Sequence, residues 1–229
     1  MLAGQRLNDP QGYQVALFPL EGLYVTQADY ETFSHASWYY ATDYAGYNAS
    51  GQRVYRCPCY APVDIKCIWV NRTECCAVWE SLSEVHLAND TINYLGILVY
   101  HDNDITNGLI TVGTVKRQGE QFNRTGTGGN VTGDHVHLET GYGRYTSSSS
   151  GGQGSAEYKY HFTDYTNVRR LHNYDALYIN DTRIVHNASG YNWKEYEGGV
   201  VPPTPTEKEI KKKKFPWVLY ARKLRQKRL

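Results

Sequence analysis

The chain has 229 residues and a formal net charge of +1, with 21 tyrosines, 21 glycines and one methionine. This length suits one ordinary domain with a full hydrophobic core. The wealth of aromatic residues and glycine predicts strands and turns rather than helices. No run approaches the roughly 18 consecutive apolar residues of a membrane-spanning helix, which argues against an integral helical membrane protein.

The amino-terminal 22 residues contain no uninterrupted apolar segment of the kind found in secretory signals. We therefore expect synthesis in a bacterial cytoplasm without a signal peptide. If the protein acts outside the cell, it must leave by another route.

Short runs of β-prone residues alternate with turn-forming residues along the chain, which predicts a mainly β, antiparallel domain over residues 1–197. The predicted strands are Val15–Phe18, Ser37–Tyr44, Val63–Val70, Ala77–Glu80, Val85–Ala88, Tyr94–His101, Leu109–Val115 and His135–Thr140. A loop is predicted at 147–155, because serine and glycine dominate it. Segments 157–162 and 176–185 then predict one more strand and a hairpin that turns at Asn180 and Asp181.

Five cysteines fall within twenty residues: Cys57, Cys59, Cys67, Cys75 and Cys76. An odd number without a signal sequence argues against a full disulfide framework. Their spacing also lacks the paired C-x₂₋₄-C pattern that marks a zinc knuckle. We expect them to serve as small buried hydrophobic residues.

The composition changes near residue 198. Residues 198–207 are rich in proline, glycine and threonine and predict an extended linker. Residues 208–229 predict a short basic amphipathic tail, and residues 207–229 together carry a net charge of +8 against −7 for the rest of the chain. Such a tail suits anionic wall polymers or a membrane surface, although a solvated extension is the alternative. The acidic body argues against nucleic acid as a partner.

Two histidines flank a single valine in the segment GDHVHLE, residues 133–139. On a strand, His135 and His137 project from the same face, because side chains alternate. They could meet at a metal ion, at a proton-transfer site or only at a solvated sheet face. The H-x-H spacing alone does not decide between these readings.

Further histidines lie where predicted strands meet turns. His35 and Asp43 occur in SHASWYYATDYAG, and His101 ends an apolar run. A catalytic zinc site commonly takes three protein ligands and leaves a fourth position open. His35, Asp43 and one histidine of the pair satisfy that count, and the other histidine then lies where a general base belongs.

The ordered series SHASWYYATDYAG, CYAPVD, the strand ending in His101, and VKRQGEQFNRTGTGGNVTGDHVHLE resembles the LytM/lysostaphin-type zinc metallopeptidases, peptidase family M23. The resemblance covers residues 30–145. Leu138 stands where the family usually has phenylalanine. Seven residues separate His35 from Asp43, whereas the family often has three, so an inserted loop is expected there.

The resemblance implies the antiparallel β-sheet fold of LytM-like metallopeptidases, including the duplicated hybrid form, and one Zn²⁺ per chain. It implies that His35, Asp43 and His137 are the zinc ligands. It further implies that His135 is the general base and that His101 helps to stabilise the oxyanion. The implied activity is hydrolysis of peptide bonds in bacterial peptidoglycan, in the stem peptide or the cross-bridge. A substrate groove with aromatic walls is expected at Tyr39, Tyr40, Tyr142 and Tyr145.

A peptidoglycan hydrolase without a signal peptide is typical of bacteriophages and prophages, by analogy. We therefore expect a phage or prophage lytic enzyme that acts at the cell wall. Either a holin or the virion itself would deliver such an enzyme. The alternative function is a catalytically inactive M23-like module that binds the cell wall or serves as a virion structural component. Inactive members of such a fold normally lack one or more ligand residues, whereas this chain has every expected residue type.

Overall fold

A computed structural model describes residues 1–29, 35, 40–144, 169–186 and 191–198. The predicted strand at 157–162, the basic tail 208–229, Tyr39 and Tyr145 lie outside the described residues. All but the first residue of the linker 198–207 also lies outside them.

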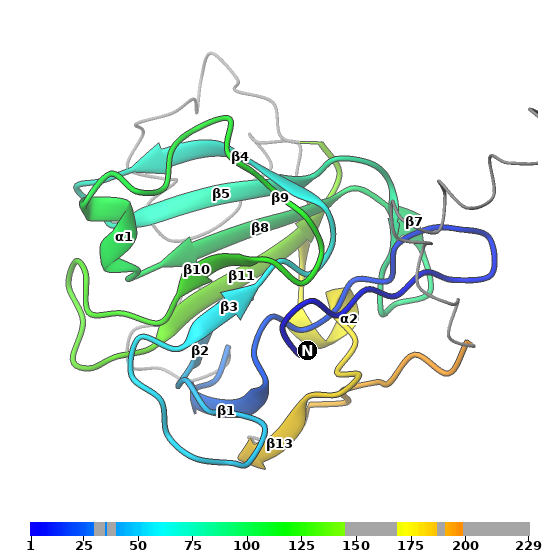
Figure 1. The fold of residues 1–229 in the computed structure, drawn as a ribbon, viewed down its shortest axis with the longest axis horizontal. Coiled ribbons are helices and arrows are strands. Elements are labelled where there is room, and N and C mark those ends of the chain that lie inside the picture. The colour runs from blue at the N-terminus through cyan, green and yellow to red at the C-terminus, as the bar shows by residue number, and fades with distance from the viewer. Residues whose placement is uncertain (30–34, 36–39, 145–168, 187–190, 199–229) are drawn as a thin grey trace, which may run out of the picture.

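The fold is mainly β, as the sequence predicts, and antiparallel pairing dominates it. One sheet has the strand order β13-β1-β2-β11-β8-β5-β4-β9, and β12 pairs with β11 beyond the end of β2 (Figure 1). Two ribbons, β10 with β3 and β6 with β7, complete the strands of the described part. The bounds are β1 (Gly22–Gln27), β2 (Thr42–Tyr44), β3 (Pro58–Tyr60), β4 (Ile65–Asn71), β5 (Cys76–Ser81), β6 (Val85–His86), β7 (Ile92–Asn93), β8 (Leu95–Tyr100), β9 (Val115–Lys116), β10 (Gln121–Arg124), β11 (Val136–Tyr142), β12 (Arg169–Leu171) and β13 (Arg183–His186).

The sheet buries both of its faces along the central strands β5 and β8. One face packs on the main core, which contains Tyr44, Trp79, Val136 and Leu138. The other face carries a smaller apolar cluster of Trp69, Cys76, Val78, Leu98 and Tyr100. Removing each such large side chain from water stabilises the fold by roughly 1.5–3 kcal/mol. The rigid centre of the sheet thus lies directly beside the histidine strand β11.

The register of β11 decides which side chains meet. His137 lies opposite Asp43 on β2 and opposite Tyr100 on β8. Directly opposed residues of antiparallel strands point to the same face. His137, Asp43 and Tyr100 therefore share the face that bears the smaller apolar cluster, and Val136 and Leu138 point into the main core.

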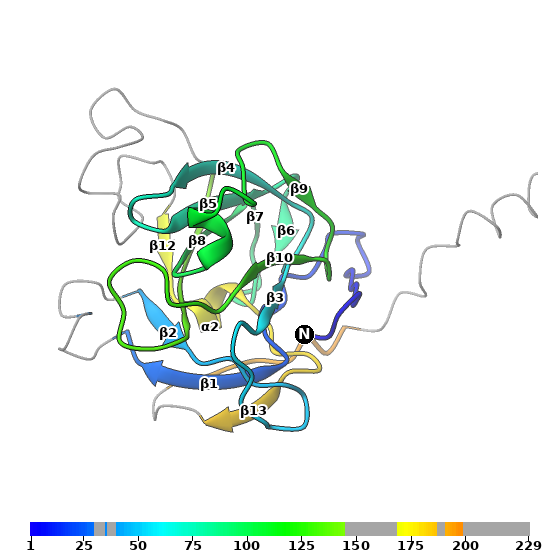
Figure 2. The same cartoon turned by 60° about the vertical axis from the view of Figure 1, so that its left-hand side comes forward.

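Two predicted strands are wrong. Leu109–Val115 is irregular up to its last residue, where β9 begins, because Gly108 directly before it and Gly113 within it adopt positive φ angles. Val15–Phe18 forms isolated bridges rather than a strand. A turn does lie at Asn180 and Asp181, but the strand after it, β13, pairs in parallel with β1 instead of closing a hairpin (Figure 2).

Two short helices interrupt the strands. Helix α1 (Asn103–Thr106) begins after Asp102, whose carboxylate accepts a hydrogen bond from the backbone N–H of Asp104. Helix α2 (Asn173–Ala176) begins after His172. In the part of the chain that the structure describes, no helix is long and apolar enough to cross a bilayer.

All five cysteines lie among the described residues, all are buried, and none forms a disulfide. Burial raises the pKa of the Cys57 thiol to about 11 and those of Cys67 and Cys76 to about 12. Thiols with such pKa values stay protonated at neutral pH and are poor nucleophiles and metal ligands. This confirms the prediction that the cysteines are small buried hydrophobic residues.

Candidate active site

Three of the predicted site residues meet at one point of the structure. One potential ligand atom from each of His35, Asp43 and His137 lies within 4.8 Å of the others, and this is the only such group of His, Cys, Asp and Glu in the described residues. Nδ1 of His137 lies 3.0 Å and Nε2 of His35 lies 3.4 Å from Oδ1 of Asp43. All three residues are buried, with exposed fractions of 2%, 7% and 6%.

The hydrogen bonds of the two histidines decide which ring nitrogen faces the cluster. Nδ1 of His35 lies 3.0 Å from the carbonyl oxygen of Ala28 and donates to it, so Nε2 is the ring nitrogen that faces Asp43. His137 has the reverse arrangement, with Nε2 3.4 Å from Oε1 of Glu139 and Nδ1 toward Asp43. A carboxylate or carbonyl behind a ligand histidine is typical of metal sites, because it orients the ring and fixes its tautomer.

The donor set fits zinc. Two imidazole nitrogens and one carboxylate oxygen are common zinc ligands, and at metal–ligand distances of about 2.0–2.2 Å the ligand atoms of a tetrahedral site lie roughly 3.3 Å apart. The observed separations of 3.0 and 3.4 Å agree with this value. Three protein ligands leave a fourth position for water or substrate.

Two further histidines border the cluster. Nε2 of His135 lies 3.4 Å from Oδ2 of Asp43, and the rings of His135 and His101 are 4.6 Å apart. Nδ1 of His135 donates to the carbonyl of Gly133 at 2.8 Å, and Nδ1 of His101 donates to that of Gly128 at 2.9 Å. Each neutral ring therefore presents an unprotonated Nε2, which can accept a proton.

The charges at the centre of the cluster are strongly coupled. Burial alone would raise the pKa of Asp43, but hydrogen bonds with His137 and His35 hold it well below its usual range. Burial likewise opposes a charge on His137, but Asp43 and Glu139 raise its pKa to about 10. The cluster thus favours a positive charge at the position that the ligand atoms surround.

Burial and the nearby His135 lower the pKa of His101 to about 4. At neutral pH the ring is then uncharged and Nε2 is an acceptor. To donate to an oxyanion, the role that the resemblance implies, His101 must first gain a proton at Nε2. That role stays a prediction.

The backbone around His101 is tightly held. His101 has a φ of +79°, in the left-handed region that residues other than glycine rarely occupy. Its N–H donates to Cys75 at 2.9 Å, and its carbonyl accepts from the N–H of Gly128 at 2.9 Å. Strained backbone persists where surrounding contacts determine it, and it is often found at functional sites.

One arginine ties together the segments beside the two bordering histidines. The Arg56 guanidinium donates to Asp102 and Asp104, each at 2.6 Å, and its backbone N–H donates to Asp134 at 3.0 Å. Asp102 directly follows His101 in the sequence, and Asp134 directly precedes His135. Arg56 therefore holds both histidine segments to one point.

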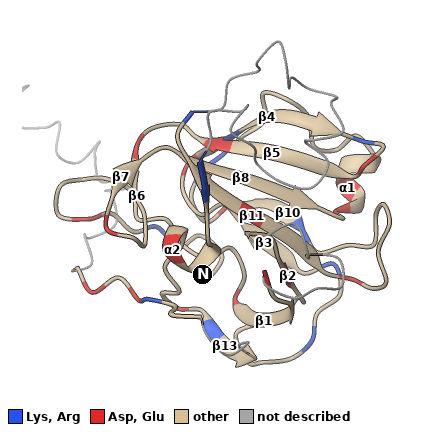
Figure 3. Cartoon of the chain, turned by 180° about the vertical axis from the view of Figure 1, so that it is seen from behind, with Lys and Arg blue, Asp and Glu red and all other residues tan. Residues whose placement is uncertain are grey.

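The same network extends to β10. The backbone N–H of Arg124 donates to Asp102 at 2.7 Å, and its guanidinium lies 3.7 Å from Asp104. Figure 3 shows red at α1 and blue at the end of β10, on the same side of the molecule. Thr125 adds a hydrogen bond from its hydroxyl to Asp134 at 2.7 Å.

Gly126→Ala is expected to reduce any activity of the site much more than Gly133→Ala. A Cβ atom on Gly126 would overlap the carbonyl oxygen of His101, whereas one on Gly133 would meet no atom within 4 Å. Neither glycine has a positive φ, so space alone distinguishes them. Rates of substrate hydrolysis and thermal melts of the two variants measure the effect. Equal rates would show that the close approach to His101 is unimportant.

Glu139→Gln is expected to weaken zinc binding about tenfold to a hundredfold, because the amide is a poorer acceptor behind His137 than the carboxylate. Glu139 is fully buried. Competition with a chelator of known affinity measures the change. Glu80→Gln serves as the control, since Glu80 on β5 is also buried but pairs with Arg144 at 2.9 Å instead of with a histidine of the cluster. Equal affinities of the two variants would contradict the assignment.

The two predicted substrate-binding tyrosines that the structure describes, Tyr40 and Tyr142, lie in different surroundings. Tyr40 is half-buried and its ring stacks on that of His172 at 4.5 Å. Alternation along β11 puts Tyr142 on the face opposite to His137, so Tyr142 does not share the side of the sheet that holds the cluster.

Sequence reasoning missed Arg56, Asp102 and Asp134. The available signal was the acidic residue directly beside each bordering histidine.

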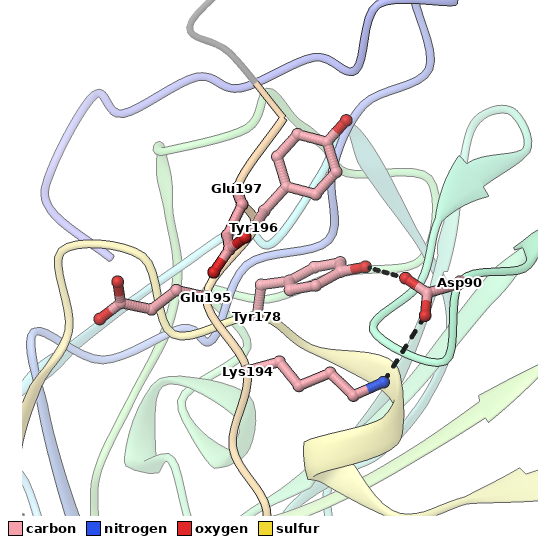
Figure 4. A pocket seen from close by; sticks show the side chains of 6 residues that line it. All are labelled: Asp90, Tyr178, Lys194, Glu195, Tyr196 and Glu197. Carbon is pink, nitrogen blue, oxygen red and sulfur yellow. Dashed lines mark hydrogen bonds and ion pairs between the residues drawn. The ribbon is translucent and has the colours of Figure 1, made fainter.

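A hollow at another part of the surface contains none of the predicted residues (Figure 4). Its lining consists of Asp90, Tyr178, Lys194, Glu195, Tyr196 and Glu197. The Tyr178 hydroxyl donates to Asp90 at 3.0 Å, and Lys194 lies 3.7 Å from the same carboxylate. Its central groups bond to one another, so the histidine cluster is the better candidate for an active site.

Comparison with known proteins shows similarity to a phage protein. No family model matches the chain. Morphogenesis protein 1 of Bacillus phage B103 is 31% identical over 190 residues, which cover 80% of this chain and 45% of that protein. The chain therefore spans less than half the length of this relative.

Among solved structures, the crystal structure of a zinc-containing peptidase from Vibrio cholerae shares 18% sequence identity at a TM-score of 0.37. The match covers 61% of this chain and 42% of that one. This likeness is too remote to establish fold or activity. Membership of the LytM/lysostaphin-type peptidases stays a prediction from the motifs.

Proposed function

We propose that the chain is a zinc-dependent peptidase that hydrolyses peptide bonds of bacterial peptidoglycan. The observation that carries this proposal is the buried convergence of His35, Asp43 and His137, with Nε2 of His135 3.4 Å from the same aspartate. Peptidoglycan, in its stem peptide or its cross-bridge, is the substrate that the resemblance of the motifs suggests. One zinc ion per chain follows from the single ligand cluster of the described residues.

The residues around the cluster suit metal-assisted hydrolysis. A zinc ion held there would lower the pKa of water toward about 7 and polarise a peptide carbonyl. His135 accepts the proton of the attacking water at Nε2, because its Nδ1 proton is engaged by Gly133. The same nitrogen can return that proton to the departing amine. His101, beside it, assists by interacting with the oxyanion once Nε2 carries a proton.

The phage relative supports a setting for this activity. Morphogenesis protein 1 belongs to a Bacillus phage and is 31% identical to the chain. We propose that the chain likewise comes from a phage or prophage and acts at the bacterial cell wall. An inactive wall-binding or virion structural module is the second candidate, which a phage morphogenesis protein also suits. The complete ligand set favours the enzyme.

Elemental analysis of the purified protein, together with the loss of turbidity of a peptidoglycan suspension with and without chelator, tests the proposal. About one zinc per chain with clearing that stops on chelation is the expected result. Zinc without any clearing across several wall types would favour the inactive module. No zinc after purification with added metal would overturn the metal site itself.

A further inference from the structure

Four flat groups from β12, Tyr40 and the start of α2 stack on one another. The guanidinium carbon of Arg170 lies 5.1 Å from the ring centroid of Tyr40. That ring stacks on His172 at 4.5 Å, and His172 stacks on Tyr174 at 5.0 Å with only 10° between the planes. The stack therefore carries a cation at one end.

His172, between Tyr40 and Tyr174 in the stack, is held by hydrogen bonds. Nδ1 of His172 lies 2.6 Å from Oδ2 of Asp29, and the other oxygen of Asp29 accepts a hydrogen bond from the Tyr191 hydroxyl at 2.9 Å. The backbone of His172 is held at the start of α2, where its carbonyl accepts from the N–H groups of Asp175 at 2.9 Å and Ala176 at 3.0 Å. Because His172 is held in this way, the Tyr40 ring that stacks on it and the Arg170 guanidinium over that ring are restrained by stacking.

The strand register places Arg170 on the same side of the sheet as the cluster. Arg170 on β12 lies opposite Gly141 on β11. Gly141, Glu139 and His137 alternate onto one face, so Arg170 shares that face. Gly141 is four residues from His137, which corresponds to roughly 13 Å along the strand. Arg169, opposite Tyr142, points to the other face.

The chemistry of Arg170 suits an anion. Arg170 is exposed, and no carboxylate in the described part of the chain pairs with it. Stacking on Tyr40 involves the face of the guanidinium and not its N–H edge, and that edge matches a carboxylate in a two-point hydrogen bond. Arg144 offers a contrast, because its guanidinium donates to Glu80 at 2.9 Å.

We propose that Arg170 binds a carboxylate of the substrate peptide at a distance of about four extended residues from the bond that is cut. This inference rests on the proposed function and adds a specificity site to it. The preferred substrate is then an acidic peptide with at least one free carboxylate outside the reacting peptide bond. Tyr40 contributes by holding the guanidinium flat and by contacting the peptide backbone beside it.

The test uses two versions of one stem-peptide fragment of peptidoglycan, one with all carboxylates free and one fully amidated. The zinc-loaded wild-type protein is expected to cut the free form with a kcat/KM about tenfold higher, since one charge-assisted hydrogen-bond pair is lost on amidation. Arg170→Ala should bring the ratio close to one, and Arg170→Lys should retain part of it. Arg169→Ala, on the opposite face, is the matched control and should keep the wild-type ratio.

Binding of the two fragments to zinc-loaded His135→Ala protein gives a readout that does not need turnover, and the affinity should differ in the same sense. A wild-type protein that cuts both fragments equally, or an Arg170→Ala protein that keeps the preference, would overturn the carboxylate site alone. A wild-type protein that holds zinc but cuts neither fragment, nor whole peptidoglycan, would instead contradict the proposed function. The two failures are therefore distinguishable.

Discussion

His135→Ala is expected to keep about one zinc per chain and to lower kcat/KM by roughly a hundredfold or more, the usual effect of removing a general base. Its Nε2 borders Asp43 at 3.4 Å, but His135 is not one of the three residues whose ligand atoms surround the metal position. The loss should fall on kcat more than on KM, because the proton transfer occurs during the reaction rather than on binding. Zinc analysis and steady-state kinetics on the same preparation provide both values.

His137→Ala is expected to lose zinc as well as activity. Its Nδ1 lies 3.0 Å from Asp43, and its removal leaves only two ligands. His186→Ala is the matched control, because His186 is an exposed histidine on β13 whose ring lies 5.0 Å from that of Tyr24 and outside the ligand cluster. Full activity of the His135→Ala protein would contradict the role of His135 as general base. Zinc retained at full occupancy by the His137→Ala protein would contradict the role of His137 as a ligand.

The convergence of the site was only partly predictable from the sequence. The H-x-H alternation on β11 predicts that His135 and His137 share a face, since this depends on neighbouring residues alone. The pairing of His137 with Asp43 joins residues 94 positions apart. Local pattern contains no information about that register, and the ordered motifs of a known family supplied it instead. Tyr142 was expected near the site, but the same alternation of side chains along β11 places it on the face opposite to the cluster.

The failed strand predictions have a physical cause as well. Leu109 and Val112 are β-prone, but they are exposed to 72% and 59% and lie between glycines with positive φ angles. Propensity for strands counts only where a neighbouring strand and a core are present. Arg56 was likewise hidden from sequence reasoning. It adopts a φ of +53° and its partners come from three other segments, so no local pattern marks it.

A protein stripped of metal by chelator is expected to bind Zn²⁺ more tightly as the pH rises. The pKa of His137 is raised to about 10 despite burial, by the hydrogen bonds that its ring donates to Asp43 and Glu139. Below that pH the ring carries a proton on the nitrogen that the metal needs, so the metal must displace it. The apparent Kd should therefore fall about tenfold per pH unit from about pH 7 to about pH 9, with close to one proton released per zinc.

The same charges set the stability of the chelated protein. The contribution of His137 is fully present below its ordinary pKa of 6.5 and is lost as the pH rises through about 10. The contribution of Asp43, whose pKa is lowered, is present above its ordinary value of 3.8 and is lost as the pH falls. As far as these two groups decide it, the free energy of unfolding without metal is expected to be highest between about pH 4 and about pH 6.5.

Zinc should reverse this trend on the alkaline side, because the metal replaces the proton as the positive charge beside Asp43. Calorimetric titration in two buffers of different ionisation enthalpy measures the released proton, and denaturant unfolding near pH 6 and pH 9 with and without chelator measures the stability. Glu139→Gln should reduce the proton release near neutral pH, since one of the two groups that raise the His137 pKa is then uncharged. A zinc affinity that does not change over this pH range would show that His137 enters the site already neutral, and the coupled cluster of Asp43, His137 and Glu139 would have to be reassigned.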